Sequence, residues 1–256
     1  MNINDLSTQL LYTTVPIFGE KSDGSQVSGS GFIFSIFDKT DPSKSIPLLI
    51  TNHHVIDGIV NGFIEFCLSE NNMPIKGRSI RVNFDGNVLK NKLGSLDLIA
   101  IPLADVLNNL KNNNINVFYR TISKDIIPTK SQIDELSALE QVTFIGYPSG
   151  IYDNFNTTSI IRQGITATPI WNNFKGEPIF LIDAGVFPGS SGSPVFIYNQ
   201  GSYPTKDGIS IGSRILFVGV ISETILRQGS TYLDLGRVIN SLAMYEELEK
   251  LMKPYL

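Results

Sequence analysis

The sequence predicts an all-β protein made of two successive antiparallel barrels or sandwiches, followed by one C-terminal helix. Three observations support this prediction. Short apolar or alternating runs of strand length recur along most of the chain. Clusters of Gly, Asn, Asp and Pro separate these runs, as they do in turns between antiparallel strands. Only the last segment changes to a helical period.

The first series of expected strands has a turn cluster after most of its members, such as Asn71-Asn72 and Asp85-Gly86-Asn87. A short helix over 104–111 follows the series, and the polar run Asn112-Asn113-Asn114 then indicates a solvated connector. The strands of this series are expected at 28–37, 46–51, 62–68, 78–84 and 97–103. We therefore expect an N-terminal half over residues 1–111 and a connector over 112–135.

A second series of strands is expected in a C-terminal half over residues 136–256, at 142–146, 159–168, 178–183, 194–198 and 216–222. The chain then changes period, because apolar residues recur at spacings of three and four. This pattern predicts an amphipathic helix that packs one stripe on the body and ends near Pro254. The stripe consists of Val238, Leu242, Tyr245, Leu248 and Met252.

Composition excludes several classes of protein. A chain of 256 residues with 42% hydrophobic and 17% charged residues can bury a sizeable core, so a largely disordered protein is excluded. The net charge of −4 and the lack of a basic run argue against a nucleic-acid binder. No apolar stretch is long enough to cross a bilayer, so no membrane partner is expected.

The redox and targeting features predict a cytoplasmic protein. Cys67 is the only cysteine, so no internal disulfide can form, and its strand-like surroundings predict a buried, inert thiol. The first eleven residues contain no Lys or Arg and only one short apolar pair, and we expect no signal peptide.

Three short patterns carry residues suited to covalent catalysis, in the order histidine, carboxylate, serine. The first is LITNHHVI at 49–56, which contains the only two histidines, His53 and His54. The second is LDLIA at 96–100, which places Asp97 inside an apolar strand, where a buried carboxylate needs hydrogen-bond partners. The third is PGSSGSP at 188–194, where serines stand between glycines.

Each of these residue types has a role in nucleophilic catalysis by a serine. A serine hydroxyl is a poor nucleophile unless a base removes its proton, and histidine is suited to that exchange near neutral pH. A carboxylate on the other ring nitrogen fixes the tautomer and stabilises the imidazolium. Glycines beside the serine let backbone N–H groups converge where an oxyanion develops.

The three patterns resemble the trypsin-like (chymotrypsin-fold) serine peptidases, and in particular the disulfide-free bacterial Deg-type branch. TNHHV at 51–55 is similar to that branch's TNNHV block, LDLI at 96–99 to its DLA block, and DAGVFPGSSGS at 183–193 to its nucleophile block. The resemblance implies His54 as general base, Asp97 as orienting acid and Ser191 as nucleophile. It also implies an oxyanion hole formed by the N–H groups of Gly189 and Ser191.

The resemblance further implies a chymotrypsin-like double antiparallel β-barrel with a C-terminal α-helix, each barrel having six strands. Supporting blocks extend it to nearly the whole chain: SGSGFI at 28–33, FIGYP at 144–148, GITA at 164–167 and VGVIS at 218–222. The peptide-binding domain appended to many Deg-type relatives is not expected here. The implied activity is that of a serine endopeptidase that works through an acyl-enzyme.

The resemblance also suggests how a substrate binds. A peptide is expected to pair as an extra strand along Val220, Ile221, Ser222, Glu223 and Thr224, and Ser222 is expected to hydrogen-bond Asp97. Gly185 falls near the floor of the primary pocket, and its neutrality favours a small or apolar residue before the cleaved bond. Asp234 or Glu223 at the pocket rim is the alternative and favours a basic residue.

The sequence departs from the family pattern at two positions beside the expected nucleophile, and the first bears on regulation. Ser190 stands where extracellular zymogens carry an Asp that pairs with a newly cut N-terminus, so activation by N-terminal cleavage is not expected. Ser193 replaces a common glycine. Since no zymogen feature is present, we expect restraint by narrow substrate choice or by a regulatory protein partner.

Other interpretations remain beside this one. On a strand, neighbouring residues face opposite sides, so only His54 is expected to face Ser191, and His53 is expected to be structural. The same geometry disfavours a metal site, and neither a metal nor an organic cofactor is expected. The order of the patterns excludes an α/β-hydrolase elbow. The alternative function is a peptidase-like module that binds a peptide without cleaving it.

Overall fold

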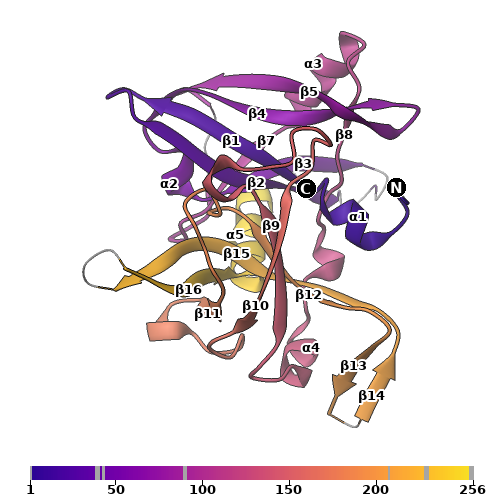
Figure 1. Ribbon diagram of the computed structural model, residues 1–256, viewed down its shortest axis with the longest axis vertical. Coiled ribbons are helices and arrows are strands. Elements are labelled where there is room, and N and C mark those ends of the chain that lie inside the picture. The colour runs from indigo at the N-terminus through magenta and orange to yellow at the C-terminus, as the bar shows by residue number, and fades with distance from the viewer. Residues whose placement is uncertain are drawn as a thin grey trace.

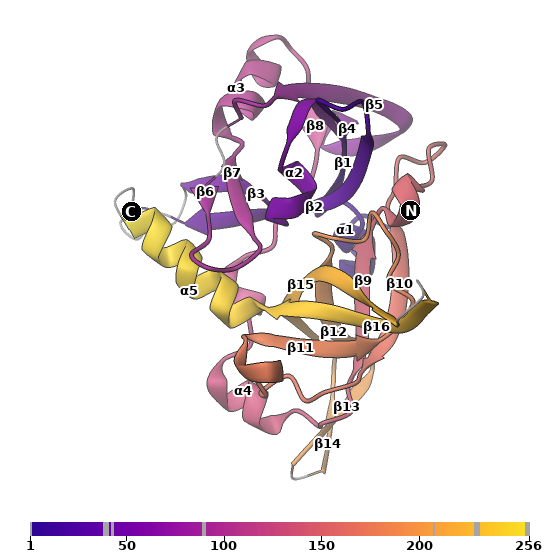
Figure 2. The same cartoon turned by 90° about the vertical axis from the view of Figure 1, so that its left-hand side faces the viewer.

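Two antiparallel β-structures lie one above the other in the computed structural model, and the C-terminal helix runs beside both (Figures 1 and 2). The structure describes residues 2–37, 41, 44–88, 91–206, 208–227 and 231–253. The expected chymotrypsin-like all-β architecture with a C-terminal helix is confirmed. Among the described residues no helix has the length and apolar character needed to cross a membrane.

The first half is an eight-stranded antiparallel sheet in the order β5-β4-β1-β2-β3-β7-β6, with β8 added beside β4. It therefore has two strands more than expected, because the two-residue strands β6 and β8 extend it. Its strands are β1 (Thr14–Lys21), β2 (Gln26–Phe37), β3 (Ser45–Thr51), β4 (Ile59–Glu70), β5 (Met73–Asp85), β6 (Asn91–Lys92), β7 (Ile99–Pro102) and β8 (Val117–Phe118).

The second half closes into a six-stranded barrel in the order β10-β11-β16-β15-β12-β9. Between β12 and β15 a separate hairpin projects from the body, at the bottom of Figure 1. The barrel strands are β9 (Gln141–Gly146), β10 (Ile160–Thr166), β11 (Ile179–Asp183), β12 (Pro194–Asn199), β15 (Arg214–Arg227) and β16 (Thr231–Asn240), and the hairpin strands are β13 (Ser202–Thr205) and β14 (Gly208–Ile211).

A short helix, α1 (Leu6–Leu10), precedes the first strand, and three others lie between strands: α2 (His53–Ile56), α3 (Ala104–Asn112) and α4 (Lys130–Glu135). Single 3₁₀ turns lie at Lys124–Ile126, Pro148–Gly150 and Phe174–Gly176. The connector expected over 112–135 contains β8, which pairs with β4 of the first half. The domain boundaries themselves stay a prediction.

The C-terminal helix α5 spans Ser241–Met252, and Val238, expected on its apolar stripe, lies instead in β16. The helix begins at Ser241 because the Asn240 side chain caps it by accepting the Leu242 N–H at 2.8 Å. Its buried face is formed by Met244, Leu248 and Met252. The expected end near Pro254 lies outside the described residues.

One hydrophobic cluster contains buried residues of both halves. Phe32 of β2 meets Phe217 of β15 with ring centroids 5.3 Å apart, and both rings are fully buried. Met244 and Leu248 of α5 belong to the same cluster of buried residues. Because side chains from both halves interdigitate, the relative position of the halves is fixed by packing.

Candidate active site

His54 and Asp97 form a close polar contact near the junction of the halves. Strand β3 ends at Thr51, and both histidines stand in the first turn of α2, not at a strand end as the alternation argument assumed. That argument for separating His53 from His54 was therefore wrong, because the chain turns into a helix right after Thr51. The Nδ1 atom of His54 lies 2.6 Å from Oδ2 of Asp97.

Asp97 is held to the start of α2 through both its carboxylate and its backbone. The His54 N–H donates to Oδ1 at 3.1 Å. The Asp97 carbonyl accepts from Asn52 Nδ2 at 2.8 Å and from the His53 N–H at 3.3 Å. These contacts satisfy N–H groups that a helix start leaves without intrahelical partners. Asp97 thus fixes both the position of α2 and the orientation of the His54 ring.

The Asp97 carboxylate is less buried than its apolar neighbours suggested. It precedes β7, and its side chain is 40% exposed, while Leu96 and Leu98 on either side point into the core. Partial burial is the largest influence on this carboxyl and acts to raise its pKa. The hydrogen bond and charge of the His54 ring, together with the His54 N–H, outweigh burial, so the pKa of Asp97 lies below its ordinary value.

The segment around Ser191 is fixed by Ser30, a fully buried residue of β2 in the first half. The Ser30 N–H donates to the Ser191 carbonyl at 2.9 Å, and the Ser30 hydroxyl donates to the Gly189 carbonyl at 2.8 Å. The same hydroxyl accepts the Tyr147 N–H at 2.9 Å. Through these bonds the first half shapes the loop that carries the expected nucleophile.

The backbone amides of this loop divide into two groups. The N–H groups of Ser190, Gly192 and Ser193 donate to backbone carbonyls of the protein. Those of Gly189 and Ser191 donate in none of the hydrogen bonds found among the described residues. They are the two amides expected to form the oxyanion hole, and they are available to an incoming acceptor.

The direction of the Gly189 N–H is set from outside the loop. The Pro188 carbonyl accepts the Ser149 N–H at 2.5 Å. Since the carbonyl and the N–H of one peptide unit point in opposite directions, this bond turns the Gly189 N–H away from Ser149. Ser149 itself has a φ of 51°, a left-handed conformation that is uncommon for a residue with a side chain.

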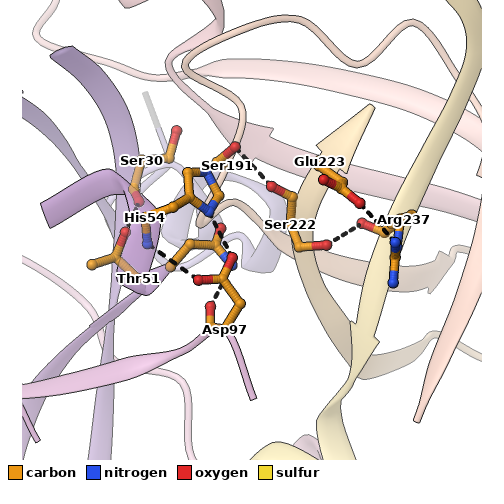
Figure 3. A network of polar contacts seen from close by, with 9 residues as sticks. Ser30, Thr51, His54, Asp97, Ser191, Ser222, Glu223 and Arg237 are labelled. Atoms are coloured by element: carbon orange, nitrogen blue, oxygen red, sulfur yellow. Dashed lines mark hydrogen bonds and ion pairs between the residues drawn. The ribbon is translucent and has the colours of Figure 1, made fainter. Parts of the chain in front are cut away.

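The Ser191 hydroxyl donates to the Ser222 carbonyl at 2.9 Å. Figure 3 shows the His54 imidazole between Ser191 and Asp97, with the contact from Ser191 running to Ser222. None of the hydrogen bonds in the described part of the chain joins Ser191 to His54. The three expected catalytic residues thus meet at one site, with the serine hydroxyl on a neighbouring carbonyl.

Strand β15 offers an open edge beside Ser191 over a shorter stretch than expected. Val220 pairs with Pro194 on one side and Ile239 on the other, and Ile221 exchanges hydrogen bonds with the Ser191 loop. Because strands and the Ser191 loop already flank both residues, Val220 and Ile221 leave no open edge for a peptide strand. Beyond them, the described pairings of residues 222–224 are with β16 alone.

The expected hydrogen bond from Ser222 to Asp97 is not formed. The Ser222 hydroxyl donates to the Arg237 carbonyl at 3.4 Å instead. The pairing of β15 with β16 shifts register between Ile221 and Glu223, so that Ser222 is the extra residue of a β-bulge. A bulge redirects a side chain, which explains the change of partner.

A groove of about 400 Å³ runs beside Asp97 and Ser222. One of its walls carries Arg237, whose guanidinium binds Glu223 at 2.8 Å and Glu177 at 2.7 Å (Figure 3). Glu223 is therefore ion-paired within the protein. Asp234, the other acid expected at the pocket rim, is exposed.

Arg162 of β10 is the residue near the site that sequence reasoning missed. A Cβ added to Gly185 would lie 2.9 Å from one of its terminal nitrogens. Its guanidinium also stacks on Phe187, 4.7 Å from the ring centroid. No local sequence signal marked this residue, because its inward position follows from the pairing of β10 within the folded barrel.

Gly192 is a position where the fold demands glycine. Its φ is +88°, and an added Cβ would collide with the Ser30 carbonyl. We expect Gly192→Ala to lower kcat/KM by about 10²-fold, because the Ser191 loop must shift. Gly201→Ala is the matched control, with a φ of +82° and nothing within 4 Å of the added atom. Equal activity of the two variants in a peptidase assay would contradict this expectation.

Cys67 is buried as expected, with 6% exposure, and burial raises the pKa of its thiol. We expect iodoacetamide to leave the native protein unmodified at pH 8 and to modify one thiol per chain in denaturant. Intact-mass measurement reports both states. Stoichiometric modification of the native protein would show that the thiol is accessible.

Comparisons with known proteins agree with this architecture. The family model described as a trypsin-like peptidase domain matches residues 29–202. Deg5 has 14% identity and a TM-score of 0.53, over 96% of this chain and 90% of its own. The MamO protease domain from Magnetospirillum magneticum has 14% identity and a TM-score of 0.52, over 94% and 98%. The thermostable serine protease AL20 from an extremophilic microorganism has 11% identity and a TM-score of 0.52, over 94% and 97%. No curated protein matches the chain.

Proposed function

Because the chain belongs to the trypsin-like peptidase family, we propose that it is a serine endopeptidase that works through a triad of His54, Asp97 and Ser191. The observation that carries this assignment is the 2.6 Å contact between His54 Nδ1 and Asp97 Oδ2, at a site that also holds Ser191. A carboxylate in that place leaves the other ring nitrogen free to accept a proton.

The reaction has two halves. Ser191 Oγ attacks the carbonyl carbon of the scissile bond while its proton passes to Nε2 of His54. The N–H groups of Gly189 and Ser191 stabilise the oxyanion, and His54 then gives the proton to the leaving amine. Water next attacks the acyl ester by the same path, which releases the acid product and restores the serine.

Attack requires one local rearrangement. The Ser191 hydroxyl has to leave the Ser222 carbonyl and turn toward His54, which a rotation about χ1 accomplishes. Catalytic hydrogen bonds often tighten only when substrate is present. The substrate backbone pairs with the open edge of β15 at Ser222, Glu223 and Thr224, as an added strand.

The setting of this activity is part of the proposal. The single buried cysteine is compatible with the reducing cytoplasm, where we place the protein. The hydroxyl of Ser190, at the position where zymogens carry an Asp, is buried without a partner among the described residues. Restraint of proteolysis is therefore assigned to narrow substrate choice or to a regulatory protein.

Labelling with a fluorophosphonate tests the assignment. The reagent modifies a serine only where a base and an oxyanion hole activate it, so we expect one adduct per chain, on Ser191, found by peptide mass mapping. The alternative is a non-cleaving peptide-binding module, which the engagement of the Ser191 hydroxyl by Ser222 favours. Absence of an adduct, with or without added peptides, would support that alternative.

A further inference from the structure

Arg162 points toward the interior side of the second barrel, next to the Ser191 loop. Residues 160, 162 and 164 of β10 are the less exposed set of an alternating strand, and Ile161 and Ile165 face outward. Across the sheet Arg162 pairs with Phe144, a buried residue, and its guanidinium lies 5.9 Å from that ring centroid. A half-buried cation thus lies at the end of the barrel that carries the site.

Gly185 and Phe187 enclose this guanidinium. The ring of Phe187 stacks on it at 4.7 Å, and one terminal nitrogen of the guanidinium lies 2.9 Å from where a Cβ at residue 185 would stand. Gly185 lies six residues before Ser191, in the same loop. Gly185 gives the floor of the expected primary pocket no charge of its own. The Arg162 guanidinium of β10 therefore brings a positive charge to that floor.

Within the described part of the chain, no carboxylate pairs with this cation. None of the ion pairs and side-chain hydrogen bonds among the described residues uses the Arg162 guanidinium, whereas Arg214 and Arg237 are both paired with glutamates. Asp183 and Asp234, which lie close to Gly185 along the chain and across the sheet, are exposed and do not pair with it. Stacking on aromatic rings leaves the in-plane N–H donors of a guanidinium unused.

We propose that Arg162 makes the primary pocket selective for a carboxylate, so that the protein cleaves after Glu or Asp. This rests on the proposed peptidase function. A planar guanidinium binds a carboxylate through two parallel N–H···O bonds, and the aromatic walls strengthen that pairing by limiting water. A neutral isostere loses the charge and half of the acceptors, so the structure favours Glu over Gln.

Two peptide amides that differ only in Glu or Gln before the cleaved bond test this directly. We expect wild-type kcat/KM to be about 10- to 100-fold higher for Glu. In Arg162→Gln the ratio falls to about one, because the Glu peptide loses its partner. Arg162→Lys retains a smaller preference for Glu, since it keeps the charge without the planar fork. Arg78→Gln, at an exposed site on β5, is the matched control and keeps the wild-type ratio.

Fluorophosphonate labelling of the same samples distinguishes a failure of the peptidase assignment from a failure of the role given to Arg162. A wild-type protein that labels on Ser191 but cleaves the Gln peptide as fast as the Glu peptide overturns the role of Arg162 and leaves the peptidase assignment intact. A Glu preference that persists in labelled Arg162→Gln overturns it as well. A wild-type protein that fails to label overturns both, and the wild-type ratio is decisive even if a variant does not fold.

Discussion

Ser191→Ala is expected to lower kcat by about 10⁶-fold and to abolish fluorophosphonate labelling, while the fold is retained. The substitution removes the hydroxyl that acts as the nucleophile in the proposed mechanism. In the structure it breaks a single hydrogen bond, to the Ser222 carbonyl, so the variant is expected to unfold near the wild-type temperature. Casein digestion or peptide hydrolysis measures the first effect, and calorimetry the second.

Ser190→Ala is the matched control for this experiment. Ser190 is the preceding residue, it is 1% exposed, and its hydroxyl has no partner among the described residues. Removing a buried, unpaired hydroxyl is neutral or slightly stabilising, so activity is expected to stay within a few-fold of wild type. Loss of labelling in Ser190→Ala with retention in Ser191→Ala would move the nucleophile to the neighbouring residue.

Asp97→Asn is expected to lower kcat by about 10⁴-fold at neutral pH. An amide that donates a hydrogen bond toward His54 Nδ1 reverses the ring tautomer, so that Nε2 carries a proton and cannot take one from Ser191. The bonds from the Asn52 side-chain amide and the His53 N–H to the residue 97 carbonyl survive, so the loop keeps its place. Steady-state kinetics measures the loss. Activity within tenfold of wild type would exclude Asp97 as the orienting acid.

The same pair of proteins reveals the electrostatic part of this contact. Because the folded pKa of Asp97 is lowered, its ionised form contributes stability above the unfolded carboxyl value of about 3.9, and this contribution is lost as pH falls through the folded pKa. The difference in unfolding free energy between wild type and Asp97→Asn should therefore shrink as the pH falls below about 4. It should be modest, since the side chain is 40% exposed. Urea titrations at several pH values measure it.

Local pattern was sufficient to predict most of the strands. Alternating or apolar runs predicted β2, β3, β4 and β5, and later β9 to β12, to within about three residues at most ends. They did so because side chains along a strand alternate between core and solvent. Strand β16 was missed since Val238 happens to lie four residues before Leu242 and so extends the helical period backward. Asn240, the helix cap, was the local signal that separated strand from helix.

The site was predictable as a set of residue types but not as a set of contacts. The order of the three motifs pointed to His54, Asp97 and Ser191, yet the helix start at His53 and the bulge at Ser222 depend on tertiary pairing. For the same reason nothing near the motifs indicated Ser30, which binds a loop about 160 residues away, or Arg162, which approaches Gly185 from another strand. Contacts between distant segments follow from packing, which a local pattern does not encode.

The hydrophobic cluster that both halves share has a consequence for the stage of folding at which peptidase activity appears. His54 and Asp97 come from one half and Ser191 from the other, and α5 packs into the same cluster that contains Phe32 and Phe217. Under the proposed mechanism a chain with only one half folded lacks either the nucleophile or its base. We therefore expect activity to require the docking of both halves and to be lost when that junction melts.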